Sequence, residues 1–301
     1  MPNVVLLGIA QDGGVPQAGC SCPRCISVHN QQSDELFPVS LGIEDDDGKY
    51  HLIEASRTMA KQFFLWSSSS SSSQKCCNVV SPITSVTLTH LHLGHVDGLG
   101  QFGREVMGKQ DVRLYVSEKV LSALQKRGPI LEPFDPYIIP KDKNNTIQLG
   151  KGVTLEFYPV PHRDMEGQGD THAIVIRGEK RSILFLPDHD TWNQTLALHQ
   201  ESSIRSFLSS LKVDVALIDG TFWSYEELGT THRDFSTIPH PPITQTLKLL
   251  GKKKQQLGVD PDIFFIHFNH TNPILDSNSP FQPQVESLGW KIGRQGMSWE
   301  I

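Results

Sequence analysis

The sequence predicts an α/β fold in one domain. Short apolar runs typical of buried strands alternate with segments of helical periodicity over the 301 residues. Many of the strand-like runs end in a polar or ionisable residue. Hydrophobic residues make up 38% of the chain and charged residues 20%, a composition that excludes a disordered protein. Neither a repeat nor a clean domain boundary is visible, so we expect residues 1–301 to form a single domain.

The strand-like runs begin near the N-terminus, where a short apolar stretch is ended by Gly13 and Gly14. In order along the chain they are residues 4–9, 51–53, 85–88, 112–116, 153–160, 173–176, 183–186, 215–218 and 263–266. Helical periodicity predicts helices at residues 56–66, 98–107, 117–125, 202–211 and 243–250. Several of these segments begin with a Ser or Thr that can cap the free N–H groups of a helix. We expect the serine tract at residues 67–73 to be a flexible surface loop, and residues 128–145 to be a long excursion between elements.

The net charge of −6 disfavours a nucleic-acid partner, because the one short basic run, residues 252–254, is too small to attract a phosphate backbone. No apolar run reaches the length of a membrane span, and residues 4–10 lack the basic lead of a signal peptide. Three of the five cysteines lie within six residues, which suits metal binding in a reducing compartment. We therefore expect a cytoplasmic protein with a small-molecule substrate, no nucleic acid and no membrane partner. The sequence is also compatible with a homodimer.

Three histidines, His90, His92 and His95, lie within six residues directly after a strand-like run. On an extended chain His90 and His92 project to the same side, and a turn at Gly94 can bring His95 toward them. Three imidazoles are a common ligand set for zinc and leave one position for a reactive water. A run of histidines on a half-buried strand, alternating with leucines, is the competing interpretation.

This segment resembles the signature of the metallo-β-lactamase superfamily, His-x-His-x-Asp-His followed closely by Gly. The match covers His90, His92, His95 and Gly98. It departs at Gly94, where the family normally carries an aspartate that binds the second metal. The resemblance implies an αββα sandwich of two mixed sheets with outer helices, and it implies a second metal site weakened by the missing carboxylate.

The same resemblance implies that a His, an Asp and a C-terminal His complete the metal centre. His162, Asp188 and His267 each follow an apolar strand-like run, in that order. Their plainer interpretations are an exposed loop histidine, a helix cap and a loop hydrogen-bonding histidine, respectively. His270 is a weaker candidate for the last ligand. Glu54 stands where the family has an early acidic residue that braces the metal loop, or else it is a surface residue before a helix.

Cys20, Cys22 and Cys25 supply three thiolates at a spacing compact enough to wrap one zinc ion. Three free cysteines are the alternative. The N-terminal block through these cysteines looks like the start of the pyrroloquinoline quinone biosynthesis protein B group. It is also similar to the carbon-phosphorus-lyase phosphodiesterase, whose cysteine loop holds a structural zinc completed by a downstream histidine. The similarity continues at residues 219–222, 238–243 and 267–273. By this resemblance we expect His240, or as second choice His232, to be the fourth ligand.

Together these features predict a metal-dependent hydrolase that acts on a phosphodiester or another ester. The first two motif histidines and His162 would hold one metal, and Asp188 would bridge toward a second site formed by His95 and His267. Metal-bound water, its pKa lowered to roughly 7, would attack the ester, with Asp188 as proton acceptor and His95 as the other residue expected in catalysis.

Zinc is the expected ion, with one structural ion and one or two at the active site, where iron or manganese are alternatives. Two other functions compete with hydrolysis. One is an iron-dependent oxygenase of cofactor biosynthesis, and the other is a non-catalytic, metal-stabilised binding protein or carrier.

Overall fold

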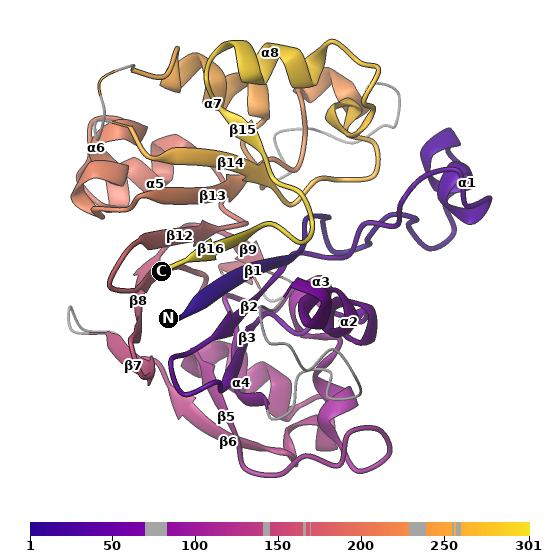
Figure 1. Ribbon diagram of the computed structural model, residues 1–301, viewed down its shortest axis with the longest axis vertical. Helices are drawn as coiled ribbons and strands as arrows, with labels where there is room; N and C mark the ends of the chain where they lie inside the picture. Colours follow the sequence, from indigo (N-terminus) through magenta and orange to yellow (C-terminus); the bar gives the residue numbers. More distant parts are fainter. Residues whose placement is uncertain are drawn as a thin grey trace.

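Two seven-stranded mixed sheets face each other, with helices on their outer sides (Figure 1). The computed structural model describes residues 1–69, 83–140, 145–164, 167–168, 170–228, 239–254, 256 and 260–301. Each sheet has antiparallel pairs at one side and parallel pairs at the other. The predicted αββα sandwich is confirmed. Among the described helices, none combines the length and the apolar character needed to cross a membrane.

The first sheet joins the two ends of the chain. Its order is β16 (Ser298–Glu300), β1 (Asn3–Gly8), β2 (Ser40–Glu44), β3 (Tyr50–Ile53), β4 (Ile83–Thr87), β5 (Val112–Val116) and β6 (Phe134–Ile138). The last strand pairs with the first, and the two termini lie close together in Figure 1. Alternate side chains of β1 enter two apolar clusters, because the side-chain period of a strand is two. Val4 and Leu6 pack between the sheets, whereas Val5 and Leu7 pack against the outer helices.

The second sheet carries strands from the later part of the chain. Its order is β15 (Lys291–Ile292), β14 (Asp262–Ile266), β13 (Val215–Asp219), β12 (Ser182–Leu186), β11 (His172–Arg177), β8 (Val153–Pro159) and β7 (Thr146–Gly150). A separate two-stranded ribbon pairs β9 (Arg163–Asp164) with β10 (Gly167–Gln168). Strands β12, β13 and β14 are parallel, so their carboxyl ends lie at one edge of the sheet. Polar residues that follow these strands therefore meet.

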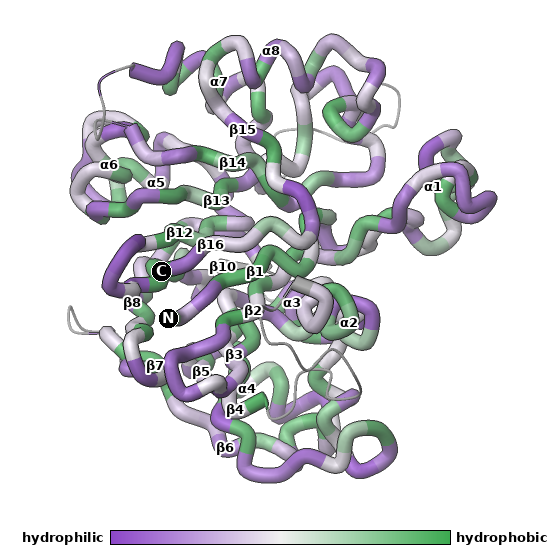
Figure 2. The backbone as a smooth tube through the Cα atoms, viewed as in Figure 1, coloured by the Kyte–Doolittle hydropathy of each residue, from purple (hydrophilic) through white to green (hydrophobic). Residues whose placement is uncertain are grey.

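Helices cover both sheets on the solvent side. The helices are α2 (Met59–Ser69), α3 (Leu93–Val96), α4 (Glu118–Gln125), α5 (Trp192–Leu198), α6 (Ile204–Ser210), α7 (Ile243–Leu250) and α8 (Phe281–Ser287), whereas α1 (Pro23–His29) projects away from the sandwich (Figure 1). Short 3-10 segments lie at η1 (Leu99–Phe102), η2 (Pro129–Leu131), η3 (Tyr225–Leu228) and η5 (Pro273–Leu275). Figure 2 shows hydrophobic residues along the sheet strands and more hydrophilic ones on the outer loops. The predicted helices at residues 117–125, 202–211 and 243–250 are confirmed.

The helix predicted at residues 98–107 is wrong. The preceding helix α3 ends at Val96, and residues 98–107 contain only the short segment η1, followed by turns. Gly98, Gly100 and Gly103 make this stretch a poor helix former. Gly98 also serves close packing, since a Cβ there would lie 2.2 Å from the Ser56 carbonyl oxygen.

Two loop predictions also need correction. Helix α2 continues through the first three serines of the tract at residues 67–73, where the Ser67 and Ser68 hydroxyls donate to the Phe64 carbonyl. The rest of that tract lies outside the described residues, as do Cys76, Cys77 and His232. The excursion at residues 128–145 contains η2 and β6, and β6 pairs in parallel with β5. Pairing with a distant strand overrides the loop-like composition.

Candidate metal centre

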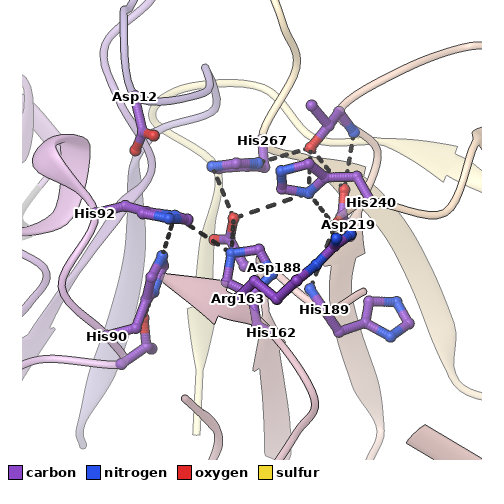
Figure 3. A network of polar contacts seen from close by, with 12 residues as sticks. Asp12, His90, His92, His162, Arg163, Asp188, His189, Asp219, His240 and His267 are labelled. Atoms are coloured by element: carbon purple, nitrogen blue, oxygen red, sulfur yellow. Dashed lines mark hydrogen bonds and ion pairs between the residues drawn. The ribbon is translucent and has the colours of Figure 1, made fainter. Parts of the chain in front are cut away.

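Four side chains form what we call the first cluster: His90, His92, His162 and Asp188 (Figure 3). Each can offer one ligand atom, and these atoms lie within 4.8 Å of one another. His90 Nε2 is 2.9 Å from His92 Nδ1, which is 3.3 Å from His162 Nε2. His162 Nε2 is 3.7 Å from Asp188 Oδ1. Three imidazole nitrogens and one carboxylate oxygen are a familiar ligand set for zinc.

The strand ends bring these residues together. His90 and His92 follow β4 in the first sheet. His162 and Asp188 follow β8 and β12 in the second. The backbone amide of His172 in β11 donates to the Thr89 carbonyl at 3.2 Å. This bond joins the two sheets beside the motif. The first cluster therefore lies across both sheets, at one end of the sandwich.

Asp188 also faces what we call the second cluster, which contains Asp12, His95 and His267. Their ligand atoms lie within 4.8 Å of one another. Asp188 Oδ2 is 3.3 Å from His95 Nε2, and Asp188 Oδ1 is 3.4 Å from His267 Nε2. Asp12 Oδ1 is 3.5 Å from His95 Nε2. Asp188 thus lies between the two clusters, where the sequence interpretation expects a bridging aspartate.

Polar partners orient the imidazoles of the first cluster. Thr89 Oγ1 lies 2.8 Å from His90 Nδ1, and Asp190 Oδ1 lies 3.3 Å from His162 Nδ1. Asp190 is held in turn by Arg163, whose backbone amide and Nε donate to it at 3.1 and 3.0 Å. Such outer contacts fix the ring orientation and tautomer of a metal-binding histidine.

The second cluster has outer partners of the same kind. Glu54 Oε1 lies 3.3 Å from His95 Nδ1, and Thr221 Oγ1 lies 2.8 Å from His267 Nδ1. Glu54 is fully buried and accepts a hydrogen bond from the Thr89 amide at 3.2 Å. The bracing position expected for Glu54 is therefore confirmed. Glu54 and His267 both adopt a φ of 65°, a left-handed conformation that side-chain-bearing residues rarely adopt without such support.

Several buried polar atoms of these clusters have no hydrogen-bond partner among the described residues. They include His95 Nε2, His267 Nε2 and both carboxylate oxygens of Asp188. Leaving a buried polar group unpaired costs roughly 1–3 kcal/mol, so their convergence needs an explanation. Coordination of a cation would satisfy all of them. The residues present therefore fit a metal ion.

Electrostatics at the site favour neutral imidazoles at most positions. Burial lowers the pKa of His92 to about 4, and it lowers the pKa of His90 and of His267 well below the ordinary value. Neutral imidazole is the form that binds a metal. At His95, burial also lowers the pKa, but neighbouring carboxylates, Glu54 first, raise it to about 9. The carboxylates around His95 therefore make this position negative, which favours the binding of a metal cation.

His240 lies beside the second cluster and not beside the cysteines, so its predicted place in the cysteine site is wrong. Its Nδ1 is 2.7 Å from Asp219 Oδ2, at the end of β13, and 3.9 Å from Asp188 Oδ1. The first turn of α7 explains this position, because the Ile243 amide donates to the Phe222 carbonyl just after β13. Burial lowers the pKa of His240, but Asp219 raises it to about 9.

His270 completes the cysteine cluster. Its Nδ1 lies 3.5, 3.6 and 3.8 Å from the Sγ atoms of Cys20, Cys22 and Cys25. Zinc bond lengths of about 2.3 Å to sulfur and about 2.0 Å to nitrogen place these atoms roughly 3.6 Å apart in a tetrahedral site. Arg24 Nε donates to the His270 carbonyl at 3.0 Å and holds the two segments together. The grouping of the cysteines is as predicted, but the fourth residue is one considered only for the active site.

Sequence reasoning does not identify Asp12 or Asp219 as site residues. Asp219 ends the apolar strand β13, and the same pattern at Asp188 was sufficient for a prediction. Asp12 carries no such signal, since it precedes Gly13 in a turn far from the histidines in sequence. The one clue in the sequence was the missing carboxylate at Gly94.

Comparison with known proteins agrees with the fold. The profile of the beta-lactamase superfamily domain matches residues 52–268. Coenzyme PQQ synthesis protein B of Rhodopseudomonas palustris is 27% identical, with 98% of each chain covered. Zn²⁺-bound PqqB from Methylobacterium extorquens has a similar structure, with a TM-score of 0.76 at 21% identity, over 99% of this chain and 100% of that one. A diphosphatase from the PhnP family gives a TM-score of 0.65 at 20% identity, over 100% and 97% of the two chains. The chain belongs to the beta-lactamase superfamily.

Proposed function

We propose that the chain is a metal-dependent hydrolase that acts on a phosphodiester or a related phosphate ester. The position of Asp188 carries the proposal, because its two oxygens face two ligand clusters, at 3.7 Å from His162 and 3.3 Å from His95. Two cations bridged by one carboxylate suit phosphoryl chemistry, since they stabilise charge on both the attacking and the leaving oxygen. The structural similarity to a PhnP-family diphosphatase supports a phosphate substrate.

The first cluster would hold one ion. His95 and His267, together with Asp188, would contribute to a second. We propose zinc at both positions and in the cysteine cluster, and the Zn²⁺-bound PqqB structure supports this choice. When bound, such ions lower the pKa of a water ligand toward roughly 7 and stabilise developing negative charge.

The chain's own residues would move the protons. Asp219 holds His240 at 2.7 Å, an arrangement that fixes the direction and tautomer of the imidazole. The other ring nitrogen of His240 would then donate a proton to the leaving oxygen. Asp188 would accept the proton released by the attacking water. These roles give the reaction one general acid and one general base.

Metal content and turnover of the same preparations test this proposal. We expect the wild-type chain to hold at least one ion beyond the cysteine cluster and to hydrolyse bis(p-nitrophenyl) phosphate. His92→Ala removes one of the four ligands of the first cluster, so it should lose about one ion per chain and lower kcat at least about 100-fold. His29→Ala, at the exposed end of α1, is the matched control and should change neither value.

Two results would contradict the proposal. One is a wild-type metal content below one ion per chain beyond the cysteine cluster. The other is hydrolysis that continues unchanged in His92→Ala.

A second candidate function is an iron-dependent oxygenation step in cofactor biosynthesis. The relatives named coenzyme PQQ synthesis protein B favour it, and histidines with carboxylates also suit non-haem iron. Protein loaded with Fe²⁺ would then consume oxygen in the presence of its substrate and show no phosphodiester turnover. Retention of zinc with phosphodiester hydrolysis would exclude this candidate.

A further inference from the structure

We propose that Asp12 supplies the second cluster with the carboxylate that the histidine motif lacks at Gly94. This inference rests on the proposed function and specifies its second metal site. The sequence alone predicts a site weakened at Gly94. With Asp12, the site has four ligands from four separate segments: Asp12, His95, Asp188 and His267.

The space beside Gly94 is the first observation. A Cβ at this position would lie 2.5 Å from both Cα and Oδ1 of Asp12. The Gly94 amide donates to Asp12 Oδ1 at 3.1 Å. A side chain at position 94 and the observed place of Asp12 therefore exclude each other. Glycine is the residue that permits this close approach.

The direction of the Asp12 carboxylate is the second observation. Its Oδ1 lies 3.5 Å from His95 Nε2, and Figure 3 shows it directed toward the histidines. His95 and His267 are 0% and 1% exposed, and their Nε2 atoms have no hydrogen-bond partner in the described part of the chain. Asp188 Oδ2 also has no hydrogen-bond partner among these residues, and it faces His95 Nε2 at 3.3 Å. The two buried imidazole nitrogens and the carboxylates of Asp12 and Asp188 face a common space. This arrangement suits a divalent cation.

The backbone around Asp12 is the third observation. The Gln11 amide donates to the Phe268 carbonyl at 2.9 Å, and the Phe268 amide donates to the Ile9 carbonyl at 2.7 Å. These two bonds connect the segment just before Asp12 with the residue after His267. The distance between the two ligands is therefore set by main-chain contacts before any ion binds. Such preorganisation lowers the entropic cost of binding.

Counting zinc ions in the full-length protein tests the inference. After equilibrium dialysis against a low, buffered concentration of free zinc, we expect three ions per wild-type chain: one in the cysteine cluster and one in each active-site cluster. Asp12→Asn keeps the shape of the side chain and an acceptor for the Gly94 amide, but removes the charge. It should lower the affinity of one ion at least about 10-fold and leave two ions per chain. Competition with a zinc chelator measures that affinity without reference to activity.

Asp97→Asn is the matched control, since Asp97 lies in the same motif but pairs with Arg57 at 2.7 Å. It should retain three ions. Asp12→Ser is a second variant with the same expected loss, and near-UV circular dichroism shows whether each variant keeps its fold.

The possible outcomes separate the inference from the proposed function. Three ions with unchanged affinity in folded Asp12→Asn and Asp12→Ser would overturn the role of Asp12 and leave the hydrolase proposal intact. Two ions in the wild-type chain would overturn the second site, because only the first cluster and the cysteine cluster would then be filled. A single ion in the wild-type chain, held by the cysteines, would overturn the proposed function itself.

Discussion

His240 is the residue proposed to donate a proton to the leaving group. Its Nδ1 contacts Asp219 at 2.7 Å and Thr221 Oγ1 at 3.2 Å. Proton donation to a leaving group contributes roughly 10²–10⁴-fold to a rate, so His240→Gln should lower kcat at least about 100-fold for an alkyl phosphodiester. With p-nitrophenolate, which leaves without a proton, the loss should be much smaller. Steady-state kinetics with both substrates, beside elemental analysis, measure the difference.

The leaving-group comparison separates proton transfer from a structural role. Equal losses of kcat with the two substrates would show that His240 supports the site in another way. Loss of an ion in His240→Gln would show that it is a metal ligand.

His51 is a buried histidine of β3 in a hydrogen-bond network of its own. Nδ1 lies 2.9 Å from Ser85 Oγ, and Nε2 lies 3.4 Å from Asp45 Oδ2. Burial lowers the pKa of His51 from its ordinary 6.5, although Asp45 acts in the opposite direction. In the unfolded chain His51 binds a proton near pH 6.5, whereas in the folded protein it binds one only at a lower pH. The free energy of unfolding should fall as the pH drops from this value toward the lower pKa of the folded state.

Urea unfolding at a series of pH values checks this prediction. We expect His51→Gln to have a shallower decline between pH 7 and pH 5 than the wild-type chain, because the linked proton is gone. His29→Gln, exposed on α1, serves as the control and should follow the wild-type curve. Parallel curves for wild type and His51→Gln would disprove the role of His51.

At the scale of secondary-structure elements, strand β2 and helix α2 approach so closely that glycine is required at position 42. A Cβ on Gly42 would lie 2.4 Å from Cε2 of the Trp66 indole. Trp66 is fully buried between neighbours, so it has little room to move. Gly42→Ala should therefore lower the free energy of unfolding by about 1–3 kcal/mol, as expected for overpacking.

Denaturant unfolding of Gly42→Ala beside Gly100→Ala tests this contact. A Cβ on Gly100 would meet nothing within 4 Å, so that control should change stability by less than about 0.5 kcal/mol. Equal stability of the two variants would mean that α2 shifts away from β2 at little cost.

At the scale of the whole molecule, the cysteine cluster connects the two ends of the chain. His270 lies 245 to 250 residues from the three cysteines in sequence. A zinc ion held there would close a very long loop, which by analogy with covalent cross-links stabilises a fold by about 5 kcal/mol. Cys22→Ser should therefore lose one zinc ion per chain and a similar amount of unfolding free energy. Elemental analysis and denaturant unfolding measure the two effects.

Ser21→Ala is the control for this experiment, because Ser21 is exposed between two of the cysteines. It should keep both the zinc ion and the stability. Full zinc content in Cys22→Ser would show that the cluster does not hold the ion.

The active-site histidines could be predicted because their signal is local. His90 and His92 follow a strand at the side-chain period of that strand. The resemblance to the superfamily implied His162 and Asp188, and the apolar run before each residue located them in the sequence. Strands β2, β6 and β16 could not be predicted. Their sequences are short or contain Gly and Pro, and they depend on partners from distant parts of the chain.

The sequence by itself determined the α/β class, the histidine motif and the cysteine loop, since each depends on residue spacing over a few positions. Only the tertiary structure decided that His270 joins the cysteines, that His240 joins Asp219, and that a carboxylate stands beside Gly94. The physical reason is that sheet pairing sets these contacts. Residues far apart in sequence become neighbours when parallel strands end at one edge of a sheet. The spacing of residues along the chain does not predict which strands will lie side by side.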